Sequence, residues 1–244
     1  MIAGGKSFRR AVARRVFAFE LNNATYRIES GDKAIQLLLP TGVACSRIFL
    51  VGVLLDKEET RPDSDFWKVK FSDPTGVFRG FVGRFQPDAL ETLLKIEPPE
   101  IVAVVSKIRL FEGETATLVT VRPEIIVPVE REVRDYWIVE TAKHTLSRIE
   151  NMKKGGDELV ELAWRVYNPD LDAYEEKTKE VVKTVLEQHS VIEVKSEGDE
   201  ETVEEELAVK TEKEREEVED LEISDLDEFE FEEEEWDLSD ILED

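Results

Sequence analysis

The sequence predicts a mainly β fold with α-helices: a small five-stranded barrel, a long helix, a pair of further helices and an acidic, disordered tail. Three observations lead to this prediction. Residues 43–130 contain short segments rich in β-branched and aromatic residues, separated by turn residues, which is typical of strands. Beyond residue 130 the apolar residues follow a helical period. Residues 191–244 are highly charged and offer little that can form a core.

The charge of the chain divides it into a neutral body and an acidic tail. The 244 residues include 57 acidic and 32 basic side chains, for a net charge of −25. Residues 191–244 hold 27 of the acidic and 4 of the basic side chains, a net charge of −23, which leaves 30 acidic and 28 basic side chains in residues 1–190. The tail therefore supplies the acidity, and the body is close to neutral.

Cysteine usage and hydropathy indicate a cytoplasmic protein. Cys45 is the single cysteine, so an internal disulfide is excluded and a reducing compartment is favoured. No apolar run has the length of a signal peptide, and none approaches the about 20 residues of a membrane span. His144 and His189 lack a metal-ligand pattern around them, so we expect no metal and no other cofactor.

Residues 1–42 form a basic N-terminal segment. Arg9, Arg10, Arg14 and Arg15 are interleaved with apolar residues at roughly helical spacing, which predicts a basic helix. Two roles are open for it. The helix packs on the body with its arginines in solvent, or it is an arm that contacts phosphates.

Residues 43–130 are predicted to form the barrel. Three strand-like segments, "VACSRIFLVGVLL", "DFWKVKFSD" and "GVFRGFVG", precede a short helix, "PDALETLLKI", which begins at Pro87. Two further strands, "IVAVVSKIRLF" and "TATLVTVRPEIIV", follow the helix. This order, in under about 90 residues, is that of the oligonucleotide- and oligosaccharide-binding fold, whose second and third strands face the ligand.

Alternation assigns the faces of the second and third strands. The segment Asp73-Pro74-Thr75-Gly76 has the residue preferences of a type I turn and fixes the register of this hairpin. The residues expected to face the core are Trp67, Val69, Phe71, Phe78, Gly80 and Val82.

The outward face of the barrel combines cations with aromatic rings. Its predicted members are Phe66, Lys68, Lys70, Arg79, Phe81, Lys107, Arg109 and Arg122. Single-stranded nucleic acid requires this combination, because cations bind its phosphates and rings stack on its bases. The alternative is a solvated strand face whose two rings are covered by the N-terminal segment or by a partner. A β-bulge would also shift the assignment by one residue.

Residues 131–153 are predicted to form a long helix with one apolar side. The residues proposed to mediate subunit assembly are Ile138, Val139, Ala142, Leu146 and Ile149. This stripe either folds back on its own barrel or is a seam for helices of other subunits.

Residues 154–190 are predicted to contain a helical pair after the hinge "KKGG". One helix runs roughly from Asp157 to Tyr167, and the second is entered through Asn168-Pro169. The sequence leaves open whether this pair docks on the body or forms a separate protein-binding unit.

Residues 191–244 are predicted to be disordered, with a partner-binding end. The segment "DEFEFEEEEWDLSDILED" interleaves acids with the apolar residues Phe229, Phe231, Trp236, Leu238, Ile241 and Leu242. Such segments bind partners by folding on them, and replication and repair enzymes are the partners we expect here. The alternative is a tail that only confers solubility.

Several segments of the body resemble the archaeal replication protein A-associated family, over about residues 8–150. Among them are "ARRVFAFELNNATY", "FSDPTGVFRGFVGRFQPDALETL" and "VRPEIIVPVEREVRDYWIVETAKHTLSRIE". The most specific marks are Asp73-Pro74-Thr75-Gly76, Gln86-Pro87, Arg122-Pro123-Glu124 and Arg134-Asp135-Tyr136-Trp137. The resemblance implies a barrel that binds oligonucleotides and a heterotrimer with a large and a small subunit, assembled through residues 131–152. It also implies roles in DNA replication, recombination and repair.

The expected function is that of a non-enzymatic, nucleoid-associated subunit of a complex that binds single-stranded DNA. The alternative is an assembly adaptor that binds mainly protein partners through its helices and acidic tail. RNA as the ligand stays open, because stacking platforms accept bases of either polymer. An enzyme fits least, because the sequence has no phosphate-binding Gly-rich loop, nucleophile elbow or metal-ligand spacing. Some family members are thought to end in a winged-helix domain, from which the helical pair and acidic tail depart.

Overall fold

The computed structural model describes residues 11–28, 36–62, 64–112 and 117–195. All of these residues belong to one compact unit, residues 1–199. The six apolar residues of the tail, from Phe229 to Leu242, lie outside the described residues, so their role in partner binding stays a prediction.

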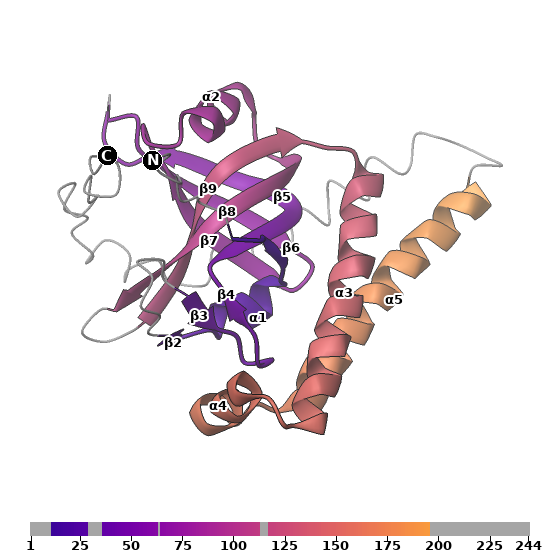
Figure 1. The fold of residues 1–244 in the computed structure, drawn as a ribbon. Helices are drawn as coiled ribbons and strands as arrows, with labels where there is room; N and C mark the ends of the chain where they lie inside the picture. Colours follow the sequence, from indigo (N-terminus) through magenta and orange to yellow (C-terminus); the bar gives the residue numbers. More distant parts are fainter. Residues whose placement is uncertain (1–10, 29–35, 63, 113–116, 196–244) are drawn as a thin grey trace, which may run out of the picture. The chain divides into compact units, whose positions relative to one another are not determined.

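Five strands close into the predicted barrel (Figure 1). They are β5 (Arg47–Glu59), β6 (Trp67–Asp73), β7 (Gly76–Val82), β8 (Glu100–Glu112) and β9 (Thr117–Pro128). The order around the barrel is β5-β6-β7-β9-β8, and β8 pairs back with β5 to close it. Every pair is antiparallel except β7–β9, and α2 (Pro87–Lys95) connects β7 to β8. This topology confirms the predicted oligonucleotide- and oligosaccharide-binding fold.

The barrel interior contains the side chains that alternation placed there. Val69, Phe71, Phe78 and Val82 are all buried, and Trp67, the first residue of β6, is half-buried. Gly80 allows β7 to approach β9 closely. A Cβ atom at this position would lie 2.4 Å from the carbonyl oxygen of Val121, which is too close for any other residue.

The N-terminal segment is not the predicted basic helix. Arg14–Arg15 form the short strand β1, which pairs in parallel with Ile48 and Phe49 of β5. The prediction was wrong because Val16 and Phe17 do not lie on one face of a helix but end this extended stretch, fully buried in the core. Arg9 and Arg10 lie outside the described residues.

Four more short elements precede the barrel. They are α1 (Ala18–Asn22), β2 (Tyr26–Ile28), β3 (Gln36–Leu38) and β4 (Ala44–Cys45). The last three form a small antiparallel sheet in the order β2-β3-β4. The predicted first barrel strand, residues 43–55, is therefore divided between β4 and β5.

The turn between β6 and β7 also caps α1. Asp73 pairs with Gly76, as the predicted hairpin requires. The Asp73 carboxylate accepts hydrogen bonds from the Thr75 amide (2.7 Å) and hydroxyl (2.5 Å), and from the amide of Ala18 (2.8 Å). The amide of Phe19 donates to the Thr75 hydroxyl (3.2 Å). The turn therefore satisfies two amide groups at the start of α1 that the helix itself leaves unpaired.

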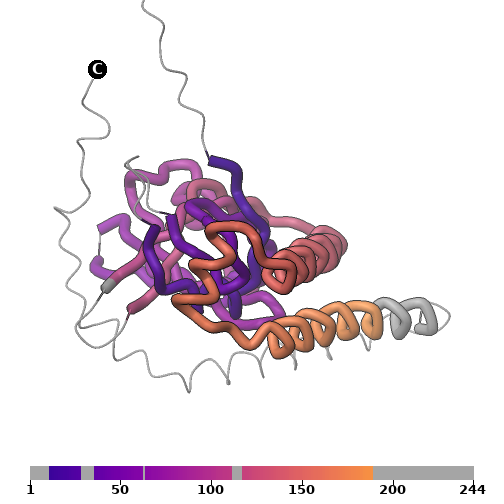
Figure 2. The backbone as a smooth tube through the Cα atoms, turned by 60° about the horizontal axis from the view of Figure 1, so that its bottom comes forward, coloured from indigo at the N-terminus to yellow at the C-terminus, as the bar shows by residue number. Residues whose placement is uncertain are grey.

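Helix α3 (Arg131–Lys154) buries its apolar stripe within the chain. Its neighbours are β5 and β8 of the barrel on one side and α5 (Leu171–Lys195) along its length (Figures 1 and 2). Of the residues predicted for subunit assembly, Ile138, Ala142 and Ile149 are buried, while Val139 and Leu146 are half-buried. The chain itself covers most of this stripe, as the alternative of folding back on its own barrel requires, and assembly with other subunits through these residues stays a prediction.

The predicted helical pair is present and docks on the rest of the body. Helix α4 (Glu158–Tyr167) begins at the cap Asp157, whose carboxylate accepts from the amide of Leu159 at 2.8 Å. It ends at Asn168, which has a left-handed conformation. An apolar cluster joins α4 and α5 to α3 and β3; its buried members are Leu38, Ile149, Met152, Val160, Ala163 and Leu171. Helix α5 continues to Lys195, beyond the predicted boundary at residue 190.

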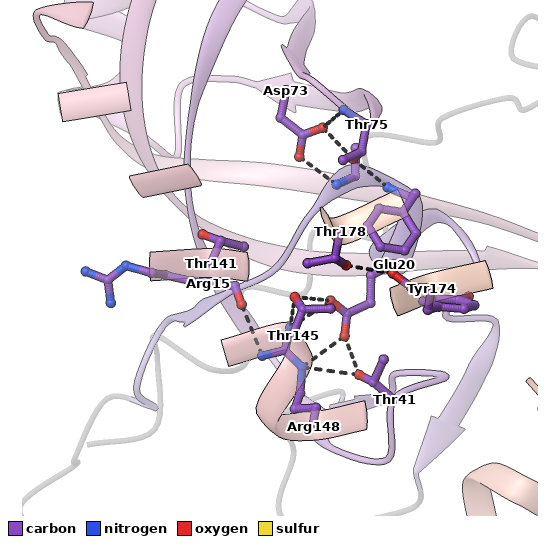
Figure 3. A network of polar contacts seen from close by, with 12 residues as sticks. Arg15, Glu20, Thr41, Asp73, Thr75, Thr141, Thr145, Arg148, Tyr174 and Thr178 are labelled. Carbon is purple, nitrogen blue, oxygen red and sulfur yellow. Dashed lines mark hydrogen bonds and ion pairs between the residues drawn. The ribbon is translucent and has the colours of Figure 1, made fainter. Parts of the chain in front are cut away.

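A buried ion pair fixes α3 to α1 (Figure 3). Glu20 is 0% exposed, and its carboxylate accepts from Nε and Nη2 of Arg148 at 3.0 and 2.7 Å. The hydroxyl groups of Thr41 and Thr145 donate to the same carboxylate. Each carboxylate oxygen thus has a guanidinium and a hydroxyl partner, which offsets the cost of burying the charge. The sequence analysis missed this pair.

Candidate nucleic-acid interface

The strand register brings the predicted outward residues together in two rows across the outside of the barrel. In the first row, Lys68 of β6 pairs with Phe81 of β7, and Arg122 of β9 pairs with Lys107 of β8. The parallel pairing of Gly80 with Val121 places Phe81 beside Arg122 and so joins the two halves of the row.

The second row lies one pleat further along the same strands. Lys70 pairs with Arg79, and Thr120 pairs with Arg109. The same Gly80–Val121 pairing places Arg79 beside Thr120. Seven of the eight predicted residues therefore lie in these two rows, and we call the surface that they form with Phe66 the cationic face. Thr120, the fourth residue of the second row, is only 2% exposed.

The two rings of the cationic face stack on one another. Phe66, which directly precedes β6, lies with its ring centroid 5.5 Å from that of Phe81, and the ring planes differ by 5°. Phe81 is only 6% exposed, whereas Phe66 is half-buried. Only one of the two rings is therefore accessible for stacking, which differs from the prediction of two open rings.

Gly83 is required for the position of Phe66. A Cβ atom at Gly83 would lie 2.9 Å from Cδ2 of the Phe66 ring. The amide of Gly83 donates to Oε1 of the buried Gln86 at 3.1 Å, so the end of β7 is held in place by the residue before α2. The sequence analysis did not single out Gly83; a glycine next to an outward aromatic pair is the signal that could have indicated a close approach.

The arginines of the cationic face are partly removed from water. Burial lowers the pKa of Arg79, and burial together with the nearby charge of Arg109 lowers the pKa of Arg122 to about 10. In the described part of the chain, Arg79 and Arg109 form no ion pair and no side-chain hydrogen bond. Arg122 and Arg109 repel one another, and both Arg122 and Arg79 are partly removed from water. An anion that binds at this surface would relieve both effects.

Acidic residues limit the cationic face at its two borders. On β5, Asp56 and Glu58 pair across from Lys70 and Lys68, and Nζ of Lys70 lies 3.6 Å from Oδ2 of Asp56. At the other border, Arg47 of β5 pairs with Lys107, and the acidic residue there is Glu124, which forms an ion pair with Arg47. The cations away from Asp56 and Glu58 are therefore those of β7, β8 and β9, and Lys107 is the most exposed of them.

Arg47 is a residue of this border that the sequence analysis missed. Its guanidinium donates to Oε2 of Glu124 from Nε (2.7 Å) and Nη2 (2.5 Å), and its Nη1 donates to the carbonyl oxygen of Ala11 at 2.9 Å. Its charge is therefore neutralised by Glu124. Its position in the first strand was visible in the sequence, but its partner is a residue far along the chain.

The described residues also bear on metal binding, thiol reactivity and membrane insertion. No group of three or more His, Cys, Asp and Glu side chains there is placed to hold a metal ion. Cys45 is 2% exposed, and burial raises the pKa of its thiol to about 12. Within the same residues, no helix is both long and apolar enough to cross a membrane.

Comparison with known proteins gives resemblances to solved structures only. No protein-family model matches the chain, and no curated protein matches it. A chain of a replication protein A heterotrimer bound to single-stranded DNA is 16% identical, with a TM-score of 0.43, over 57% of this chain and 98% of that chain.

Two other structures are similar to smaller parts of the chain. The mitochondrial single-stranded DNA binding protein of S. cerevisiae is 18% identical, with a TM-score of 0.28, over 35% of this chain and 94% of that chain. The asparaginyl-tRNA synthetase of Pyrococcus horikoshii is 11% identical, with a TM-score of 0.33, over 49% of this chain and 24% of that chain. None of these values assigns a function to the chain.

Proposed function

We propose that the protein is a non-enzymatic subunit that binds single-stranded DNA on the cationic face. The observation that carries the proposal is the pair of arginines, Arg79 of β7 and Arg109 of β8, that lie in one row on either side of β9 without an acidic partner among the described residues. Beside them a half-buried ring, Phe66, rests on a buried one. Phosphates would bind the guanidinium groups while a base stacks on Phe66.

An unpaired strand fits this surface better than a duplex. A base has to leave its stack to lie on the Phe66 ring, which costs nothing extra when the strand is already single. The cations follow the curved wall of β7, β9 and β8, so a flexible backbone can reach several of them at once. Stacking makes no distinction between bases, so we expect little sequence preference.

The resemblance to the archaeal replication protein A-associated family supports a narrower proposal, a role within a heterotrimer in DNA replication, recombination and repair. The residues that carry the resemblance have structural roles here. Asp73 and Thr75 cap α1, Gln86 holds the end of β7, and Trp137 donates from Nε1 to the carbonyl oxygen of Phe49 at 3.0 Å. Asp73, Thr75 and Gln86 thus stabilise the barrel, and Trp137 attaches α3 to it. A shared structural role is the physical reason why these residues occur in one sequence.

Substitution of the two arginines tests the proposal. The variant Arg79→Ala/Arg109→Ala is compared with Arg165→Ala/Lys154→Ala, which removes the same charge from exposed positions on α4 and α3. Binding of a labelled oligo-dT to the full chain is followed by fluorescence anisotropy. We expect at least a tenfold loss of affinity in the first variant and less than twofold in the second. Equal affinities in both variants would remove the cationic face as the binding site.

A second candidate function, a protein adaptor, is favoured by exposed apolar side chains where β9 leads into α3. Their exposed fractions are unusual for an outer sheet face and a helix start: Ile125 43%, Val127 48%, Val133 42% and Tyr136 63%. These residues, rather than the buried stripe of α3, would contact a large or small subunit. The variant Val127→Ser/Tyr136→Ser should then abolish co-purification with such subunits and leave DNA binding unchanged. Co-purification at the level of the wild type would rule this surface out.

A further inference from the structure

The chain leaves the cationic face through a tight turn between β7 and α2. The residues of this turn are Gly83, Arg84, Phe85 and Gln86. The amide of Gln86 donates to the carbonyl oxygen of Gly83 at 2.9 Å, and Oε1 of Gln86 accepts from the amide of Gly83 at 3.1 Å. Gln86 is buried, and α2, which follows it, places Leu93 in the core. Two hydrogen bonds and a docked helix therefore fix the conformation of the turn.

The turn begins beside the accessible ring of the cationic face. A Cβ atom at Gly83 would lie 2.9 Å from Cδ2 of Phe66, the ring that stacks on Phe81, so Gly83 faces the same side as Phe81. Consecutive Cα atoms are about 3.8 Å apart, so the Cα atom of Phe85 lies within about 7.6 Å of that of Gly83. The backbone at Phe85 is therefore close to the place where Phe66 would receive a base.

The two residues at the corner of the turn, Arg84 and Phe85, are exposed. Phe85 is 38% exposed, although Phe is among the residues most often buried. Cζ of Arg84 lies over the Phe85 ring, 5.0 Å from its centroid. Arg84 forms no ion pair and no side-chain hydrogen bond with another described residue. The turn therefore presents to solvent a ring and a cation that already contact one another.

A ring and a guanidinium together can bind one nucleotide. A base stacks on an aromatic ring or on a guanidinium plane, whatever its identity. A guanidinium that lies over a ring still donates N–H groups from its edge, and these match the oxygens of a phosphate. Because the turn is held by its own hydrogen bonds, little conformational freedom is lost when a ligand binds.

We propose that Arg84 and Phe85 form a second stacking unit, which binds the nucleotide next to the one on Phe66. The inference rests on the proposed function of the cationic face and extends it beyond the barrel strands. The ligand is a single strand, with one base on the Phe85 pair and the adjoining phosphate on Arg84. A duplex does not fit both units, because two successive bases would have to leave their stack.

Substitutions at position 85 separate stacking from simple apolar contact. Phe85→Leu keeps an apolar side chain and removes the ring, whereas Phe85→Trp keeps a ring. Tyr136→Leu on α3 is the control, because it removes a ring that is 63% exposed and lies outside the cationic face. The affinity of each full-length variant for a labelled oligo-dT is measured by fluorescence anisotropy.

Phe85→Leu should lose at least about fivefold in affinity, which corresponds to the lower end of the range for one stacked base. Phe85→Trp and Tyr136→Leu should stay within about twofold of the wild type. Arg84→Gln should lower the magnitude of the slope of log Kobs against log salt concentration by about 0.7, the value for one phosphate on a single strand.

Wild-type affinity in Phe85→Leu, together with a loss in Arg79→Ala/Arg109→Ala, would overturn the inference and leave the proposed function intact. Equal losses in Phe85→Leu and Phe85→Trp would also overturn it, and so would an equal loss in Tyr136→Leu, because a ring at position 85 would then not be what the strand contacts. An unchanged slope in Arg84→Gln would overturn the role of Arg84. A wild-type chain that does not bind the probe would overturn both proposals.

Discussion

The rings of Phe66 and Phe81 lie nearly parallel on the outside of the barrel, with their centroids 5.5 Å apart. Phe81 is almost fully covered and supports the ring of Phe66, which is half-buried and is the accessible ring of the pair. Arg122 of β9 lies beside Phe81, and Arg79 lies two residues before Phe81 on the same face of β7. If the proposed function holds, the ring that receives a base and the cations that receive phosphates are therefore in place before a strand binds.

The stack predicts different effects for its two rings. Phe66→Ala should weaken binding of oligo-dT by about 1–3 kcal/mol, the value of one base stacked on a ring, and should lower the free energy of unfolding by only about 1 kcal/mol through loss of the stack on Phe81. Phe81→Ala should instead lower the free energy of unfolding by about 3 kcal/mol, because it empties a buried position. Anisotropy and urea denaturation of both variants check this. Equal losses of binding and stability in the two variants would contradict the assigned roles.

The buried pair of Glu20 and Arg148 predicts a large loss of stability when one partner is changed. Glu20→Gln leaves the Arg148 guanidinium buried without its counter-ion, so the free energy of unfolding should fall by about 3–5 kcal/mol. Glu150→Gln, in an exposed pair with Lys154, should change it by less than about 0.5 kcal/mol. Chemical denaturation of both variants tests the difference, and similar small effects would show that the pair does not hold α3 to α1.

Asp73 predicts a dependence of stability on pH. Burial raises the pKa of its carboxyl group from the ordinary value of 3.8 to about 6. Between these values the folded protein binds a proton more tightly than the unfolded chain does, so this residue stabilises the fold fully below about pH 4 and loses that contribution as the pH rises through 6. Two pKa units correspond to about 3 kcal/mol.

The variant Asp73→Asn isolates this effect from the many other carboxylates of the chain. The difference in unfolding free energy between wild type and Asp73→Asn should change between pH 4 and pH 6, with the wild type losing stability relative to the variant. A difference that stays constant over this range would mean that the Asp73 carboxyl group does not titrate in the predicted window.

Cys45 predicts slow chemical modification. The thiol is buried and burial raises its pKa to about 12, so almost no reactive thiolate exists at neutral pH. A disulfide reagent such as Ellman's reagent should react only as fast as the small sheet opens, and rapidly in urea. Rapid reaction of the native protein, at the rate found in urea, would contradict the burial of this residue.

The barrel was predictable because its signals are local. Alternation in β6 and β7 and the turn at Asp73 fix one hairpin, and the helix that begins at Pro87 identifies the fold. The small N-terminal sheet was not predictable. Its strands β2, β3 and β4 have two or three residues, too few for a period. The two-residue strand β1 was missed as well, because it pairs with β5 residues more than thirty positions away.

The candidate site was predictable in part for the same reason. Alternation assigns Lys68, Arg79 and Arg122 to the outside, but it gives no information on what covers an outside residue. The burial of Phe81 depends on the ring of Phe66, and the role of Arg47 depends on Glu124 and Ala11. Likewise, the apolar stripe of α3 shows only that something covers it. In the structure, that cover comes from the barrel and α5.

One measurement tests the central claim most directly. The full-length chain is titrated into labelled oligo-dT and into a duplex of equal length, at two salt concentrations, and the anisotropy is recorded. If the cationic face binds single strands, affinity for oligo-dT should exceed that for the duplex at least tenfold and should fall as salt rises. Equal, salt-insensitive binding to both probes, or binding to neither, would contradict the proposed function and favour the adaptor.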